Sequence, residues 1–119
     1  MTAQPYHQKL ARVLDRMGAV YTVSDILAAI AEGKMQSFAY RNSWLIAQVN
    51  RLPRATVMDW LAVVGDLDDC RVLHDQAIDF AREHDIGLIR AYGRRGWMPD
   101  ARERGWRPIT TNVVYHKEL

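Results

Sequence analysis

A strand–helix–strand unit in the second half of the chain constrains the fold most. Residues 56–64 are apolar on both alternating faces, which is typical of a central strand covered on both sides. Residues 67–84 carry an apolar stripe at helical spacing, and residues 86–92 return to a strand pattern. Because such a crossover is right-handed and places its two strands parallel, the unit predicts an α/β domain.

The rest of the chain supplies elements on both sides of this unit. Apolar spacing predicts helices over 6–17 and 24–33, the second with Ser24 as its N-cap. Aromatic and branched residues predict strands at 37–40 and 43–49, followed by a break at 51–54. A short helix over 96–104 and a closing strand over 110–116 complete the order α-α-β-β-β-α-β-α-β, in a single domain spanning 1–119.

Composition narrows the class of protein. A chain of 119 residues with 49% hydrophobic residues can form a hydrophobic core without the help of disulfides or bound metals. The single cysteine, Cys70, excludes an internal disulfide and favours a reducing compartment. Apolar runs stay well below the ~20 residues that span a bilayer, and the start lacks a secretion-signal pattern. We therefore expect no membrane partner and no signal-directed secretion, and a location in the cytoplasm or an assembled particle.

Charge is nearly balanced at +2 but unevenly distributed. Residues 59–79 hold six aspartates and one basic residue, whereas residues 82–107 hold seven arginines and four acids. Such an arginine bias serves phosphate, carboxylate or protein contacts, or forms ion pairs on a solvated surface.

Several short motifs together resemble small proteins of the GNAT (acyl-CoA N-acyltransferase) fold encoded by tailed bacteriophages. They are Trp60–Asp69, Ala81–Glu83, Tyr92–Trp97, Gly105–Pro108 and Lys117–Leu119. The order of elements is also that of GNAT proteins. The resemblance implies a GNAT-like mixed central sheet flanked by helices, in a phage virion or in the host cytoplasm.

GNAT enzymes hold the pyrophosphate of acyl-CoA on a glycine-rich turn at the start of the helix after their fourth strand. Exposed backbone N–H groups and the helix dipole receive the anion there. The matching turn in this chain consists of Gly65, Asp66, Leu67, Asp68, Asp69 and Cys70. Three carboxylates would repel the two phosphates of the cofactor, and each such repulsion would cost ~1–4 kcal/mol at short range. The turn therefore argues against acyl-CoA binding, and we expect no cofactor.

Two residues are candidates for acid–base chemistry. Asp59 could act as a general base, because its strand would face the substrate cleft of the family. Pairing with an arginine at the edge of the core explains Asp59 better. Tyr92 loosely resembles a general-acid tyrosine, and the alternative favoured is a strand-end aromatic of the core. No two histidines have metal-site spacing, so we expect no metal. Cys70 lies on a helix stripe and is expected in the core.

The segment around Gly93–Trp97 is the predicted partner-binding site. Arg94 and Arg95 stand between glycines, and Trp97 and Trp106 add large flat surfaces. Tryptophan and arginine are typical anchors of protein interfaces. The competing interpretation is that Trp97 packs under the last helix while both arginines are solvated.

Three functions remain open from the sequence. The favoured one is a phage GNAT-like protein without catalysis, acting through contacts with other subunits as a minor virion or assembly component. The second is an active N-acetyltransferase that uses acetyl-CoA through a divergent turn. The third is a nucleic-acid-binding accessory protein, which near-neutral charge and only three lysines disfavour. Pairing of two copies through residues 113–115 is a further expectation.

Overall fold

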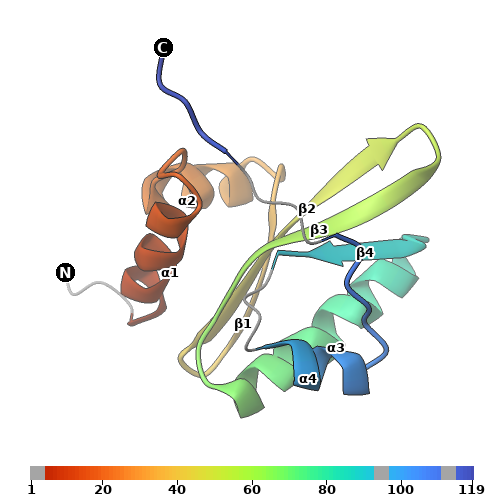
Figure 1. Ribbon diagram of the computed structural model, residues 1–119. Helices are drawn as coiled ribbons and strands as arrows, with labels where there is room; N and C mark the ends of the chain where they lie inside the picture. Colours follow the sequence, from red (N-terminus) through yellow and green to blue (C-terminus); the bar gives the residue numbers. More distant parts are fainter. Residues whose placement is uncertain (1–4, 93–96, 111–114) are drawn as a thin grey trace.

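The computed structural model describes residues 5–92, 97–110 and 115–119. Its helices and strands follow the predicted order as far as the fourth helix (Figure 1). They are α1 (Pro5–Arg16), α2 (Val23–Ala31), β1 (Gln36–Tyr40), β2 (Ser43–Leu52), β3 (Ala55–Val64), α3 (Leu67–Glu83), β4 (Leu88–Ala91) and α4 (Met98–Glu103). Among the described residues, no helix combines the length and the apolar character needed to cross a membrane.

The strands form one mixed sheet in the order β1-β2-β3-β4. β1, β2 and β3 are antiparallel neighbours, and β3 and β4 are parallel. The parallel pair confirms the strand–helix–strand unit predicted from residues 56–92. Only residues 57–60 of β3 pair with β4, so the later part of β3 lies beyond its neighbour.

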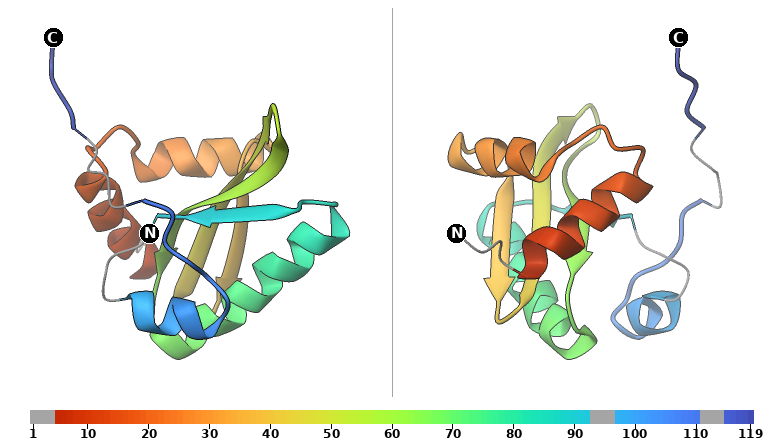
Figure 2. Two further views of the ribbon diagram at one scale, coloured as in Figure 1. Left: turned by 45° about the vertical axis from the view of Figure 1, so that its right-hand side comes forward. Right: turned by 90° about the vertical axis from the view of Figure 1, so that its left-hand side faces the viewer.

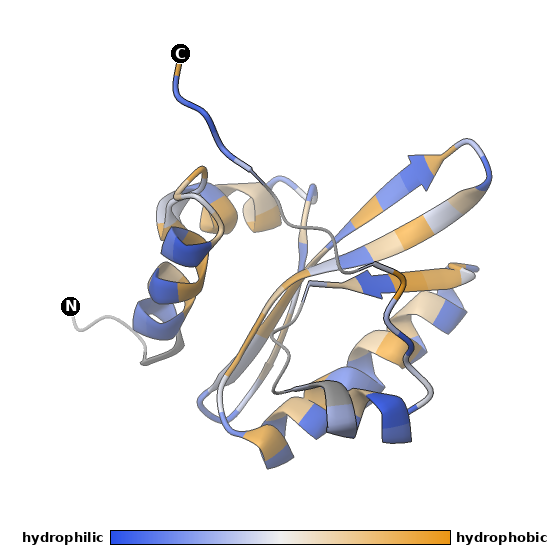
Figure 3. Cartoon of the chain, in the orientation of Figure 1, coloured by the Kyte–Doolittle hydropathy of each residue, from blue (hydrophilic) through white to orange (hydrophobic). Residues whose placement is uncertain are grey.

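Helices cover both faces of the sheet, as the two views of Figure 2 show. On one face α1 and α2 pack against the sheet through buried residues that include Leu10, Leu14 and Ile26. On the other face α3 packs through Leu73, Ala77 and Ala81. The alternation of hydrophobic and hydrophilic residues along α1 and α3 in Figure 3 is what one-sided packing requires.

A β-bulge divides β3 into two parts. Ile46 of β2 pairs with Ala62, but its neighbour Ala47 pairs with Trp60, which leaves Leu61 as the extra residue. Trp60 belongs to the core cluster under α3, whereas Ala62 belongs to the cluster under α1 and α2. The bulge therefore changes which side chains face which helices just where β4 stops pairing.

Two local features differ from the predictions, and a third lies largely outside the described residues. Thr22, not Ser24, is the N-cap of α2, because Thr22 and Asp25 exchange hydrogen bonds in a capping box. β2 runs on to Leu52 as an exposed hairpin arm, which hydrophobic patterning does not detect. Of the expected strand over 110–116, residues 111–114 lie outside the described residues. Of its described residues, Thr110, Tyr115 and His116 are not assigned to a strand.

We expect Gly65→Ala to lower the free energy of unfolding by about 3 kcal/mol or more. Gly65 has a φ of +129°, and an added Cβ would overlap the side chain of Ser43 and approach its Cα to 2.7 Å. Gly33 is the matched control, since its φ is +76° but nothing lies within 4 Å of an added Cβ. Gly33→Ala should cost only about 1 kcal/mol. Urea unfolding of both variants measures the difference, and equal losses would contradict the close approach of Gly65 to Ser43.

Candidate functional site

A pocket of about 510 Å³ opens where β3 and β4 separate. The end of β3 and the start of α3 form one wall, and residues of α1 and α4 form others. Much of the lining is apolar and includes Val13, Ala62, Val63, Val64, Leu67 and Pro108. A concave site with an apolar lining and a few polar groups is the usual form of a binding site.

Three rings form an aromatic cluster in the pocket wall. The indole of Trp60 lies 5.0 Å from that of Trp106 and 5.5 Å from the imidazole of His74, between ring centroids. Trp60 and Trp106 come from β3 and from the segment after α4, so the cluster joins parts of the chain far apart in sequence. The indole nitrogen of Trp60 is buried and has no hydrogen-bond partner among the described residues.

His74 is fixed in one tautomer by its neighbours. Its Nε2 accepts a hydrogen bond of 2.9 Å from the indole N–H of Trp106. An indole nitrogen can only donate, so the neutral ring carries its proton on Nδ1, which lies 3.0 Å from Asp75 Oδ1. Both nitrogens of His74 therefore serve structural hydrogen bonds.

Basic side chains dominate the charged lining of the pocket. They are Lys9, Arg12, Arg16, Arg71, Arg102, Arg104 and Arg107. The first three come from one face of α1, because their positions are three and four residues apart. Among the described residues, Asp100 is the acidic residue that lines the pocket.

Asp100 is held by two of these arginines. Its carboxylate accepts hydrogen bonds from Arg71 Nη2 at 2.7 Å and Nε at 3.2 Å, and Arg104 Nε lies 3.4 Å away. The hydrogen bonds from Arg71 lower the pKa of Asp100. The ion pair of Asp100 with Arg71 links α4 to α3, and it makes Asp100 a poor proton acceptor.

The carboxylates of the turn that stands in place of the expected cofactor loop are not part of the pocket lining. Gly65, Leu67 and Cys70 line the pocket, whereas Asp66, Asp68 and Asp69 do not. Asp68 is exposed, 3.3 Å from Arg71 Nη1, and buried Asp69 lies 3.8 Å from Arg41 Nη1. The predicted repulsion therefore acts from beside the pocket rather than from within it.

Cys70 is buried in the core, as its helix stripe predicts. Burial, together with the nearby carboxylates of Asp69 and Asp66, raises the pKa of its thiol to about 11. A neutral thiol is a weak nucleophile, so Cys70 is not poised for covalent chemistry.

Asp59 pairs with an arginine, which is the interpretation of this residue that the sequence favours. Its oxygens accept hydrogen bonds from Arg90 at 2.7 and 2.9 Å and from the side-chain amide of Asn50 at 2.6 Å. The hydrogen bond from Arg90 lowers the pKa of Asp59 despite burial, and Asn50 lowers it further. Asp59 does not line the pocket. The geometry thus makes Asp59 a link between β3 and β4.

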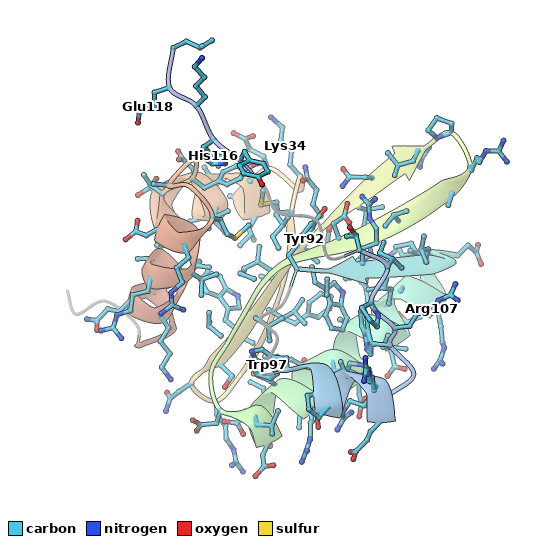
Figure 4. The ribbon with its side chains drawn as sticks, viewed as in Figure 1. Lys34, Tyr92, Trp97, Arg107, His116 and Glu118 are labelled. Carbon is cyan, nitrogen blue, oxygen red and sulfur yellow. The ribbon has the colours of Figure 1, made fainter. Side chains whose placement is uncertain are left out.

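The other predicted residues have mixed positions. Tyr92 is 64% exposed at the pocket, which differs from the core position favoured for it, because β4 ends one residue earlier. Trp97 and Trp106 both line the pocket, and Figure 4 shows Trp97 at the start of α4. Arg94 and Arg95 lie outside the described residues. No group of three metal-ligating side chains occurs in the described ranges.

Sequence reasoning missed the contribution of α1. The apolar spacing that predicts a helix over 6–17 assigns no role to Lys9, Arg12 and Arg16, which lie between the apolar positions. Their shared face was visible in the spacing, but a solvated face gives the same pattern. Only the packing of α1 against β3 brings these cations to the pocket.

Asp59→Ala should lower the free energy of unfolding by about 2 kcal/mol at neutral pH. This is less than the ~3–5 kcal/mol typical of a fully buried pair, because the guanidinium of Arg90 keeps contact with water. Asp79→Ala, on the exposed face of α3, is the control and should change stability by less than about 0.5 kcal/mol. Denaturant unfolding compares the two, and equal effects would show that the Asp59–Arg90 pair contributes nothing to stability.

Comparison with known proteins supports the fold. No protein-family model matches the chain, and no curated protein matches it. A solved structure described as a probable acetyltransferase superposes with a TM-score of 0.64 at 8% identity, covering 96% of this chain and 89% of that one. A mutant of the BH1408 protein from Bacillus halodurans gives 0.66 at 12% identity, covering 98% and 91%. A tetramutant of BH1408 gives 0.61 at 12% identity, covering 94% and 87%. The chain therefore has a mixed α/β architecture of the GNAT-like type.

Proposed function

We propose that this chain is a bacteriophage-encoded GNAT-like protein that acts through contacts with other proteins and does not transfer acyl groups. The role is that of a minor virion or particle-assembly component. The assignment to phage rests on the sequence motifs around Tyr92–Trp97 and Gly105–Pro108. The loss of catalysis rests on the pocket.

The proposal rests mainly on the hydrogen bonds and protonation of the titratable groups that line the pocket. Apart from the basic residues, those in the described lining are Cys70, His74, Tyr92 and Asp100. Acyl transfer to an amine needs a base within hydrogen-bond reach of that amine. Cys70 stays protonated, Asp100 is held by Arg71, and His74 accepts from Trp106. Tyr92 remains as an exposed phenol, whose O–H group can donate a hydrogen bond.

The alternative function is an active N-acetyltransferase with a divergent turn. Two observations favour it over the expectation from sequence alone. The pocket is large enough for part of a cofactor, and none of the three aspartates of the turn lines it. A helix N-terminus beside seven cations would also attract phosphate. This alternative still needs a base that the described pocket does not supply.

Titration of the protein with acetyl-CoA separates the two functions. We expect no saturable heat up to about millimolar acetyl-CoA at moderate salt, a level at which even weak sites are detected. A parallel incubation with a mixture of amines and acetyl-CoA should give no acetylated product by mass spectrometry. Saturable binding with turnover would overturn the proposal and make Tyr92 and the turn at Gly65 the next residues to test.

A further inference from the structure

We infer that the pocket between α1 and α4 is a receptor for an acidic polypeptide segment, one of whose carboxylates accepts a hydrogen bond from the indole N–H of Trp60. The inference rests on the proposed function and names the chemistry of the protein partner. Two independent observations lead to it, one from burial and one from charge.

The first observation is the buried donor. Trp60 is 5% exposed and lines the pocket, and its indole nitrogen has no acceptor among the described residues. A buried N–H without a partner costs about 1–3 kcal/mol. Trp106, whose ring lies beside that of Trp60 at an interplanar angle of 58°, donates its own N–H to His74. Trp60 is thus the member of the cluster that still lacks an acceptor, and an oxygen ligand in the pocket can supply one.

The second observation is the unbalanced charge at the pocket. Arg71 is paired with Asp100 and Asp68, and Arg104 with Asp100 and Asp75. Within the described residues, five further cations of the lining form no ion pair: Lys9, Arg12, Arg16, Arg102 and Arg107. Three of these cations lie on α1, and the other two lie on or just after α4. Figure 4 shows Arg107 on the same side of the sheet as Trp97. An occupant between the two helices therefore meets positive charge from both sides.

The lining favours carboxylates over phosphates. The carboxylates of Asp66, Asp68 and Asp69 stand beside the pocket at the start of α3, and they repel a doubly charged group more than a singly charged one. The apolar wall formed by Val13, Val63 and Leu67 suits aliphatic side chains, which a polypeptide has and a phosphate chain lacks. Asp100 already shows how these arginines bind a carboxylate.

The probe is a short fluorescent peptide in which glutamate alternates with leucine, and its control is the same peptide with glutamine in place of glutamate. Fluorescence anisotropy against the full chain measures binding. We expect the glutamate peptide to bind and its affinity to fall as salt rises, whereas the glutamine peptide should bind at least about tenfold more weakly.

Two pairs of variants test the named groups. Trp60→Phe keeps a ring but removes the N–H, and should weaken binding about tenfold. Trp44→Phe makes the same change in the core under α1 and α2 and should leave binding unchanged. Arg12→Gln should weaken binding about fivefold. Arg54→Gln, on the exposed β2–β3 turn, removes the same charge away from the pocket and should have no effect.

The outcomes are decisive in either direction. Equal binding of the two peptides, or wild-type affinity in Trp60→Phe and Arg12→Gln, would overturn the inference. Displacement of the peptide by inorganic pyrophosphate or a single-stranded oligonucleotide at far lower concentrations would identify a phosphate site instead. Turnover of acetyl-CoA would refute the proposed function, but it would not by itself change how the peptide and its variants bind.

Discussion

The short parallel pairing between β3 and β4 is the constraint on which the rest of the structure depends. It covers only residues 57–60 and 88–91, and the ion pair of Asp59 with Arg90 lies within it. One residue after Trp60 the bulge at Leu61 turns the remaining side chains of β3 over. The pairing thus brings α3 against the sheet and leaves the space beyond it open as a pocket.

The same arrangement divides the charged residues into two sets with different roles. Asp59, Asp69 and Asp100 are each near an arginine, and Asp59 and Asp100 link elements that are distant in sequence. Five cations that form no ion pair within the described ranges lie instead at the pocket, on α1 and in the region of α4. The pocket where the sheet opens is therefore lined by more cations than proton-accepting groups. Function follows from these residues and not from the fold.

Much of the fold could be predicted from the sequence because its central signals are strong. The apolar run over 56–64, the stripe of α3 and the crossover rule together give the parallel pair. The sequence also indicates that Asp59 pairs with an arginine, although only the structure identifies that arginine as Arg90. The N-cap of α2 was harder to predict, because Thr22 and Ser24 are both good N-cap residues. Thr22 takes this position because it forms a capping box with Asp25. The pocket could not be predicted, since the cations of α1 reach it only through tertiary packing, and the helical spacing of Lys9, Arg12 and Arg16 equally describes a solvated face.

The most direct test of the claim that Asp59 is a structural link and not a base is an NMR titration of its carboxyl carbon. Because Arg90 favours the charged form, we expect a pKa below the ordinary value of 3.8 in the folded protein. The folded state then binds fewer protons than the unfolded state, so the pair stabilises the fold above about pH 4, and this contribution is lost as pH falls through the folded-state pKa. A pKa at or above the ordinary value, and above all one near neutrality, would contradict the assignment and restore Asp59 as a candidate base for acyl transfer.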